Sequence, residues 1–157
     1  MRTAVDTNVL LDLLAGDDAA ISAAREALAD ALGGGSLAIC PIVYAELAGS
    51  FPDAGTLNRF LSALHIQVDQ FATEALVQAA VAWRRYAHNR GTEIQCSQCG
   101  HRSELHCPNC GNAIAWRQHI IPDFLVGGHA AVQADQLLTR DPHYYRRHFP
   151  PITIVSP

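Results

Sequence analysis

The stretch Ala4-Val5-Asp6-Thr7-Asn8-Val9-Leu10-Leu11 is typical of a short buried strand that ends on a carboxylate and continues directly into an apolar helix. Open α/β sheets bind their ligands at the carboxyl ends of their strands, so an acid at this position is a candidate for a functional site. An aspartate here is equally typical of a helix cap. The prediction therefore depends on whether other carboxylates reach the same edge of a sheet.

Beyond this stretch, short apolar strands alternate with amphipathic helices along most of the chain. The predicted strands are 2–6, 37–40, 66–68, 136–139 and 152–155, and the predicted helices are 8–14, 19–32, 42–48, 52–64, 72–89, 120–133 and 141–147. Strands that are separated by helices pair in parallel, because a parallel pair needs a long crossover connection. We therefore expect an α/β fold with a mostly parallel sheet.

The composition is that of a globular protein. Of the 157 residues, 49% are hydrophobic and 17% are charged, and the net charge is −4. This balance excludes a disordered chain, and it excludes a protein that attracts nucleic acid through an overall basic field. Nucleic-acid binding would need a local patch or metal ions. The sequence contains neither an apolar run of 18 residues nor a signal peptide, so we expect no membrane span. Four of the five cysteines fall within one short window, unlike a disulfide framework, so we expect a cytoplasmic protein.

Four acids occupy positions that a parallel sheet would bring together. Asp6 ends the first strand, Glu46 lies in an apolar helix, Asp123 begins a later helix and Asp141 follows the strand 136–139. We expect the helix of Glu46 to be largely buried, where an unpaired charge is costly. Converging carboxylates either retain protons or bind a divalent cation, and Mg²⁺ and Mn²⁺ prefer such oxygen ligands. Each aspartate taken singly is explained as well by helix capping.

Four short motifs, in this order, resemble the PIN-domain family, and within it the VapC-type toxins of bacterial toxin–antitoxin pairs. The motifs are Asp6-Thr7-Asn8, Tyr44-Ala45-Glu46-Leu47, Ile121-Pro122-Asp123-Phe124-Leu125-Val126-Gly127 and Leu138-Thr139-Arg140-Asp141. The resemblance covers residues 1–90 and 120–157 and implies a three-layer α/β/α sandwich with a central parallel sheet. It also implies a metal-dependent endoribonuclease with an RNA substrate, a small antitoxin partner and a homodimer.

The resemblance assigns roles to six residues. Asp6, Glu46, Asp123 and Asp141 match the acidic quartet that performs catalysis with one or two Mg²⁺ or Mn²⁺ ions, and Asn8 and Thr139 match polar positions that orient the acids. Three neighbouring charges match no motif. We expect Asp12 and Asp135 to be solvated, and Arg140 to contact phosphate, solvent or an acid.

A different pattern interrupts the α/β alternation at about residues 92–118. Cys96, Cys99, Cys107 and Cys110 form C-x2-C-x7-C-x2-C, with a glycine after each pair. Four thiolates suit one tetrahedral Zn²⁺ at about 2.3 Å per Zn–S bond, and such a closed site is structural. So short a segment cannot bury a core, so the metal would stabilise its fold. We expect one PIN-like domain over 1–157, interrupted by a small zinc-ribbon or knuckle insertion that either contacts RNA or braces the loop.

Two other classes of function remain open. One is a binding module without catalysis that recognises RNA or a protein through the zinc knuckle, and the other is a structure-specific DNA nuclease.

The segment 144–149 mixes aromatic and basic residues. Stacking on RNA is one role open to it, and packing of its aromatic side chains on the sheet is the role that we expect. The pair Gly127-Gly128 within a helix indicates close packing against a neighbour, for which a dimer partner is one candidate.

Overall fold

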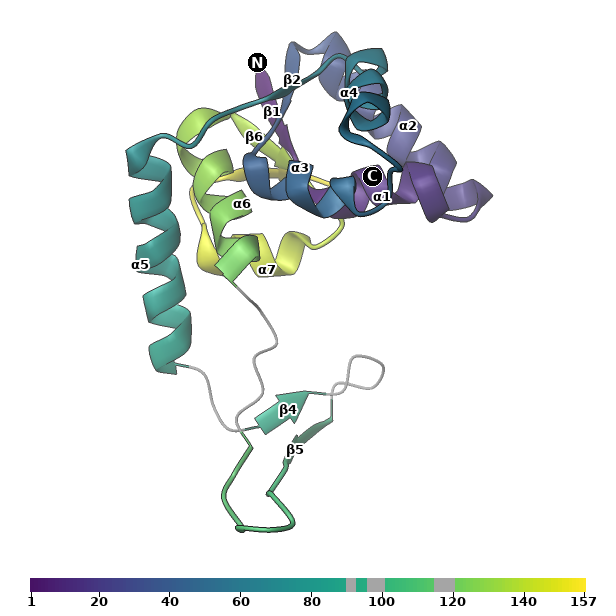
Figure 1. Cartoon of the computed structure of the whole chain (residues 1–157). Coiled ribbons are helices and arrows are strands. Elements are labelled where there is room, and N and C mark those ends of the chain that lie inside the picture. Colours follow the sequence, from purple (N-terminus) through teal and green to yellow (C-terminus); the bar gives the residue numbers. More distant parts are fainter. Residues whose placement is uncertain (90–92, 96–100, 115–120) are drawn as a thin grey trace.

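A five-stranded parallel sheet forms the centre of the computed structural model, which describes residues 1–89, 93–95, 101–114 and 121–157 (Figure 1). The strands follow the order β3-β2-β1-β6-β7. Their bounds are Arg2–Val5 for β1, Ser36–Ile39 for β2, Ile66–Val68 for β3, Gln136–Leu138 for β6 and Thr153–Val155 for β7. Every pairing in this sheet is parallel, so all five carboxyl ends lie at one edge. The acids that follow β1 and β6 are therefore neighbours.

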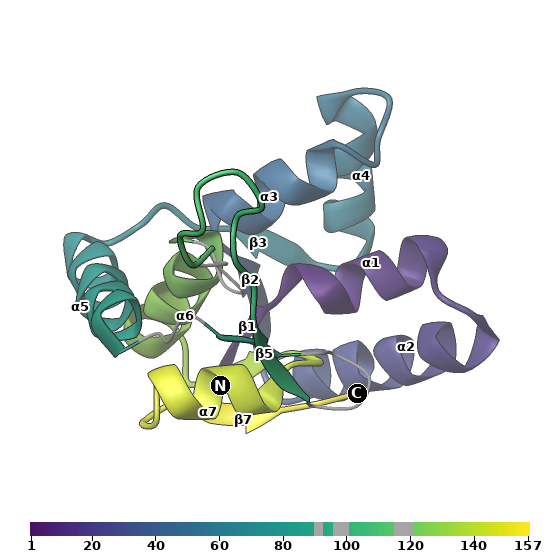
Figure 2. The ribbon, with the colours of Figure 1, turned by 90° about the horizontal axis from the view of Figure 1, so that it is seen from below.

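Helices cover both faces of the sheet, as predicted. They are α1 (Thr7–Ala15), α2 (Asp18–Gly33), α3 (Pro41–Ala48), α4 (Ala54–Ala63), α5 (Thr73–Asn89), α6 (Ile121–Gln133) and α7 (Pro142–His148). Figure 2, which looks onto the carboxyl edge, shows α1 and α2 on one side of the sheet and α5 and α6 on the other. The predicted α/β class and the three-layer sandwich are confirmed.

Local chemistry explains where these helices begin. The carboxylate of Asp17 accepts a hydrogen bond from the backbone N–H of Ala20 at 2.8 Å, and this bond caps α2. Asp53 caps α4 in the same way, through the N–H of Thr56 at 2.8 Å. Pro41 opens α3, where its missing N–H would have had no partner in the helix.

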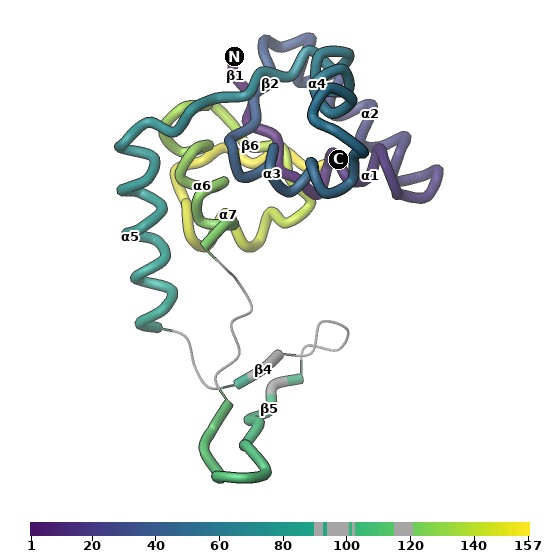
Figure 3. Tube along the Cα trace, viewed as in Figure 1, coloured from purple at the N-terminus to yellow at the C-terminus, as the bar shows by residue number. Residues whose placement is uncertain are grey.

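The two glycines of α6 allow three helices to pack closely. A Cβ at Gly127 would lie 2.2 Å from the ring of Phe149, and a Cβ at Gly128 would lie 2.4 Å from the backbone oxygen of Ala75. The Cα trace in Figure 3 shows α5 running alongside α6. The neighbour that these glycines accommodate is therefore within the chain, and the homodimer stays a prediction.

A small antiparallel pair, β4 (Glu93–Gln95) and β5 (Arg102–Glu104), lies between α5 and α6 in the sequence and apart from the main sheet (Figure 1). Cys107 and Cys110 follow this pair, whereas Cys96 and Cys99 lie outside the described residues. Neither described cysteine forms a disulfide with another described cysteine. In the described parts of the chain, no helix is both long and apolar enough to span a bilayer.

Candidate active site

A pocket of about 410 Å³ opens at the carboxyl edge of the sheet. Its wall consists of Asp6, Thr7, Asn8, Leu11, Glu46, Asp123, Asp141, Tyr144 and Tyr145. The structure thus brings all four predicted acids together from positions far apart in the sequence. The carboxyl ends of parallel strands explain the places of Asp6 and Asp141. The first turn of α6 brings Asp123 to the same edge, and the second half of α3, the helix that follows β2, brings Glu46 there.

Asp6 is the most constrained of the four acids. It begins α1, but its side chain forms no cap hydrogen bond, in contrast to Asp17 and Asp53. Instead, its Oδ2 accepts hydrogen bonds from the Thr139 hydroxyl at 2.7 Å and from the Asn8 amide at 2.8 Å. The carboxylate is therefore directed into the pocket by two polar side chains at the positions expected to orient it.

The pKa of Asp6 is raised above its ordinary value. Burial is the main cause, since the residue is only 8% exposed, and the nearby carboxylate of Asp123 adds to it. Hydrogen bonds from Thr139, from the backbone of Thr7 and from the Tyr145 side chain oppose the rise. A bound cation would relieve the cost of holding this charge in a dry, acidic site.

Glu46 differs from the prediction, because it is exposed rather than buried. Only Val43 and Leu47 of α3 are fully buried, and these positions are four residues apart on one face. The apolar residues on the remaining surface of this short helix are in part accessible. The Glu46 carboxylate nevertheless lines the pocket, where its Oε2 accepts a hydrogen bond from the Thr7 hydroxyl.

Asp141 combines the two roles that its sequence position left open. Its Oδ1 accepts a hydrogen bond from the backbone N–H of Tyr144 at 3.1 Å and caps α7, and the exposed carboxylate also lines the pocket. Its own N–H donates to the Thr139 hydroxyl at 3.0 Å. Thr139 therefore connects Asp141 to Asp6 through one oxygen atom. Asp123, in the first turn of α6, is partly exposed.

Two tyrosines form a wall of the pocket that the sequence did not predict. Tyr144 and Tyr145 are 6% and 2% exposed, and their aromatic packing was predicted correctly. Burial and the neighbouring acids raise the pKa of both phenols, so both remain protonated at neutral pH. Their positions three and four residues after Asp141 in a short helix would place them beside any site that Asp141 joins.

The prediction that Asp12 is solvated is wrong. Asp12 is buried and forms an ion pair with Arg140, across 128 residues of sequence. The backbone N–H of Arg140 also donates to the Asn8 side chain at 3.1 Å. These contacts fasten α1 to the loop that carries Asp141. Asp135 is exposed, as expected, and it accepts a hydrogen bond from the backbone N–H of Arg2 at 2.6 Å.

The donor chemistry of the pocket fits a hard divalent cation, since carboxylate oxygens are the ligands that Mg²⁺ and Mn²⁺ prefer. In the part of the chain that the structure describes, no three His, Cys, Asp or Glu side chains are already arranged as a complete ligand cluster. Mg²⁺ usually keeps several waters and takes one or two carboxylates directly, so a pocket of separated acids is compatible with it.

Comparisons with known proteins agree with this architecture. A family model described as "PIN domain" matches residues 3–94. None of the curated proteins matches the chain. The crystal structure of VapBC2 from Rickettsia felis bound to a DNA fragment from their promoter is similar over 99% of this chain and 98% of that chain, with a TM-score of 0.63 and 16% identity. At that identity the similarity is one of fold. Because the family model covers more than half of the sequence, the chain belongs to the PIN-domain family.

Proposed function

We propose that the protein is a Mg²⁺- or Mn²⁺-dependent endoribonuclease that hydrolyses RNA phosphodiester bonds. The observation that carries this proposal is the gathering of four acids in one pocket around the buried carboxylate of Asp6. PIN domains are generally metal-dependent nucleases, which supports the same assignment.

The four acids would divide the work of the site. Asp6, Asp123 and Asp141 would hold the ion, and Glu46 would hold it or orient the attacking water. A bound divalent ion activates water and stabilises the charge that develops on the phosphate in an in-line displacement. Thr139 and Asn8 fix the Asp6 carboxylate, and Thr7 fixes that of Glu46. The buried tyrosines exclude water from one side of the pocket.

The decisive experiment measures RNA cleavage with Mg²⁺, with Mn²⁺ and with a chelator, in the parent protein and in Asp6→Asn. We expect no cleavage in the chelator and a loss of a hundredfold or more in the variant, roughly the scale of losing one electrostatic contact to the transition state. Asp17→Asn is the matched control, because Asn caps a helix as well as Asp does. Metal-independent cleavage, or full activity in Asp6→Asn, would contradict the mechanism.

We also propose that the protein is the toxin of a type II toxin–antitoxin pair, that it forms a homodimer and that a small antitoxin silences it. The fold similarity to VapBC2 and the order of the acidic motifs support this. Expression of the parent protein should arrest growth, and Asp6→Asn should not. Co-expression of a small protein from the adjacent gene should restore growth. Growth unaffected by the active enzyme would contradict the toxin assignment.

The cysteine segment is proposed to be a zinc-binding insertion, at about 92–118, in a single PIN-like domain. Hydrogen bonds from the backbone N–H groups of Cys110 and Asn109 lower the pKa of the Cys107 thiol and favour its thiolate. The turn is closed by hydrogen bonds from Gly111 N to Cys107 O at 2.9 Å and from Cys107 N to Asn112 O at 2.8 Å. These contacts leave the two described thiols on one tight turn.

Metal analysis tests the zinc proposal. We expect about one Zn²⁺ per chain, held by Cys96, Cys99, Cys107 and Cys110. The ion should be lost from Cys107→Ser/Cys110→Ser and retained in Cys40→Ala, since Cys40 is a buried thiol at the end of β2. Retention of zinc in the double serine variant would show that the ligand set is wrong.

A further inference from the structure

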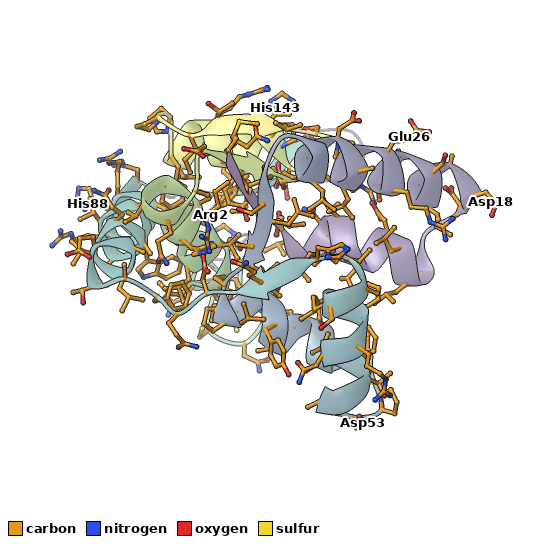
Figure 4. All side chains as sticks on the ribbon, turned by 90° about the horizontal axis from the view of Figure 1, so that it is seen from above. Arg2, Asp18, Glu26, Asp53, His88 and His143 are labelled. Atoms are coloured by element: carbon orange, nitrogen blue, oxygen red, sulfur yellow. The ribbon has the colours of Figure 1, made fainter. Side chains whose placement is uncertain are left out.

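Helix α7 has two chemically different faces, and we propose that its outer face binds the phosphate backbone of the RNA substrate. Tyr144 and Tyr145 point inward and line the acidic pocket, whereas His143, Arg146 and Arg147 are exposed. Side chains three and four positions apart share one face of a helix, so the three exposed residues form a single basic strip. Figure 4 shows His143 projecting from the outside of the molecule.

The charges of this strip are available to a ligand. All 11 basic residues other than histidine are arginine, and the net charge of the chain is −4. Arg2 and Arg140 are already paired, with Asp69 and Asp12. Within the described residues, by contrast, neither Arg146 nor Arg147 forms an ion pair. Two adjacent guanidinium groups without a carboxylate partner are suited to phosphate, which they bind in bidentate geometry.

The position of the strip fits the path of a substrate. Asp141 caps α7 and lines the pocket, so the helix begins at the site itself. An α-helix is about 10–12 Å wide with its side chains, so the outer strip lies only a few nucleotides from a phosphate held at the acids. A polyanion is repelled by an acidic pocket in a protein of net negative charge. A local basic strip beside that pocket would offset the repulsion and hold the strand in register.

A purely structural role for these arginines makes a different prediction. Both lie in the last turn of α7, where positive charge stabilises the carboxyl end of a helix. In that case their removal would lower the melting temperature and leave the salt dependence of RNA binding unchanged. Phosphate contacts release counterions, so their removal reduces the salt dependence itself.

The test measures binding of a fluorescent single-stranded RNA to the full chain at several salt concentrations. Asp6→Asn is the background, so that no cleavage occurs. Each phosphate contact to a single strand contributes about 0.7 to the slope of log K against log salt, so Arg146→Ala/Arg147→Ala should reduce the slope by about 1.4. The matched control, Arg25→Ala/Arg59→Ala, removes the same charge from exposed positions on α2 and α4 and should keep the parental slope. Arg146→Lys/Arg147→Lys keeps both positive charges and should retain most of the parental slope.

Three results would overturn the inference: a parent without salt-dependent RNA binding, an unchanged slope in Arg146→Ala/Arg147→Ala, or equal losses in the two alanine variants. Melting curves establish that each variant is folded. The inference rests on the proposed nuclease function, but the two fail separately. Cleavage by the parent without an effect on the slope refutes the basic strip alone. Salt-dependent binding through the strip without any metal-dependent cleavage refutes the nuclease alone.

Discussion

The acidic pocket and the cysteine turn are built in opposite ways. The pocket collects carboxylates from residues 6, 46, 123 and 141, and these side chains come from strands and helices that a buried core holds in place. The cysteine turn consists of residues 107–112, which close on themselves through two backbone hydrogen bonds and are almost entirely exposed. A site assembled over long range depends on the packing of the fold, whereas a local site with no core depends on its ligand.

The two regions should therefore respond differently to the loss of metal. Hard carboxylate oxygens in an open pocket exchange Mg²⁺ or Mn²⁺ with solvent, and the surrounding sheet does not need the ion to fold. Thiolates on a coreless turn would hold zinc as part of the folding reaction. The largest difference between the two regions is expected when zinc is removed.

Removal of zinc should unfold the cysteine segment and leave the α/β sheet intact. Structural zinc contributes on the order of 10–16 kcal/mol to such small sites, all of which would be lost in Cys107→Ser/Cys110→Ser. Limited proteolysis should then cut between Asn89 and Ile121, while the main calorimetric transition keeps its midpoint within a few degrees. Loss of the main transition would mean that the pocket depends on zinc, and would remove the contrast between the two regions.

Alanine at Gly128 should destabilise the α/β fold that holds the pocket, through packing between α6 and α5 alone. Its Cβ would meet the backbone oxygen of Ala75 at 2.4 Å, and a backbone atom cannot rotate away. We expect a loss of about 3 kcal/mol in the free energy of unfolding, at the upper end for overpacked cores. Urea denaturation measures it. Gly33→Ala is the control, since nothing lies within 4 Å of that Cβ and it should change stability by less than about 1 kcal/mol.

The sequence predicted that the acids come together, because the carboxyl ends of parallel strands lie at one edge of the sheet. It could not predict the exposure of Glu46, because Ile42, Val43, Tyr44, Ala45 and Leu47 are apolar on all sides of α3. Periodicity selects a buried face only where polar residues mark the other. The ion pair of Asp12 with Arg140 was equally hidden, since nothing local joins residues 128 positions apart.

The position of Tyr144 and Tyr145 in the wall of the pocket could not be predicted from the sequence either. The residue types of the segment predicted that its aromatic side chains pack together. Whether α7 lies beside the pocket depends on the path of the chain between β6 and α7, which residue types do not reveal. The strands β4 (Glu93–Gln95) and β5 (Arg102–Glu104) were not predicted, because they are mostly polar and lack the apolar residues that marked the strands of the main sheet. The caps at Asp17 and Asp53 are local by contrast, because each carboxylate accepts a hydrogen bond from an N–H group three residues away.

Removal of the Thr139 hydroxyl should change the pH dependence of the pocket. Its hydrogen bond to Asp6 favours the charged carboxylate and opposes the rise in the pKa of Asp6 that burial causes. In Thr139→Val the pKa of Asp6 rises further, so the proton competes with the metal up to a higher pH. The acidic limb of the activity profile should move to higher pH, and activity at neutral pH should fall about tenfold. Thr139→Ser keeps a hydroxyl and should retain the parental pH profile. If the acidic limb of the profile does not move in Thr139→Val, the protonation of Asp6 does not control the rate of cleavage.

The smallest effect is expected at Gly111, and it concerns the cysteine turn alone. Its φ of 71° lies in the left-handed region, where a Cβ costs about 1 kcal/mol even though nothing lies within 4 Å of it. Gly111→Ala should therefore weaken zinc binding about fivefold, measured by competition with a chelator, and leave RNA cleavage unchanged. Gly111→Asn should lose less, because asparagine tolerates this conformation. The loss of stability in Gly128→Ala arises from contact with a neighbouring helix, whereas the loss in Gly111→Ala arises from the conformation of its own backbone. A loss of cleavage in Gly111→Ala would mean that the turn acts on the pocket after all.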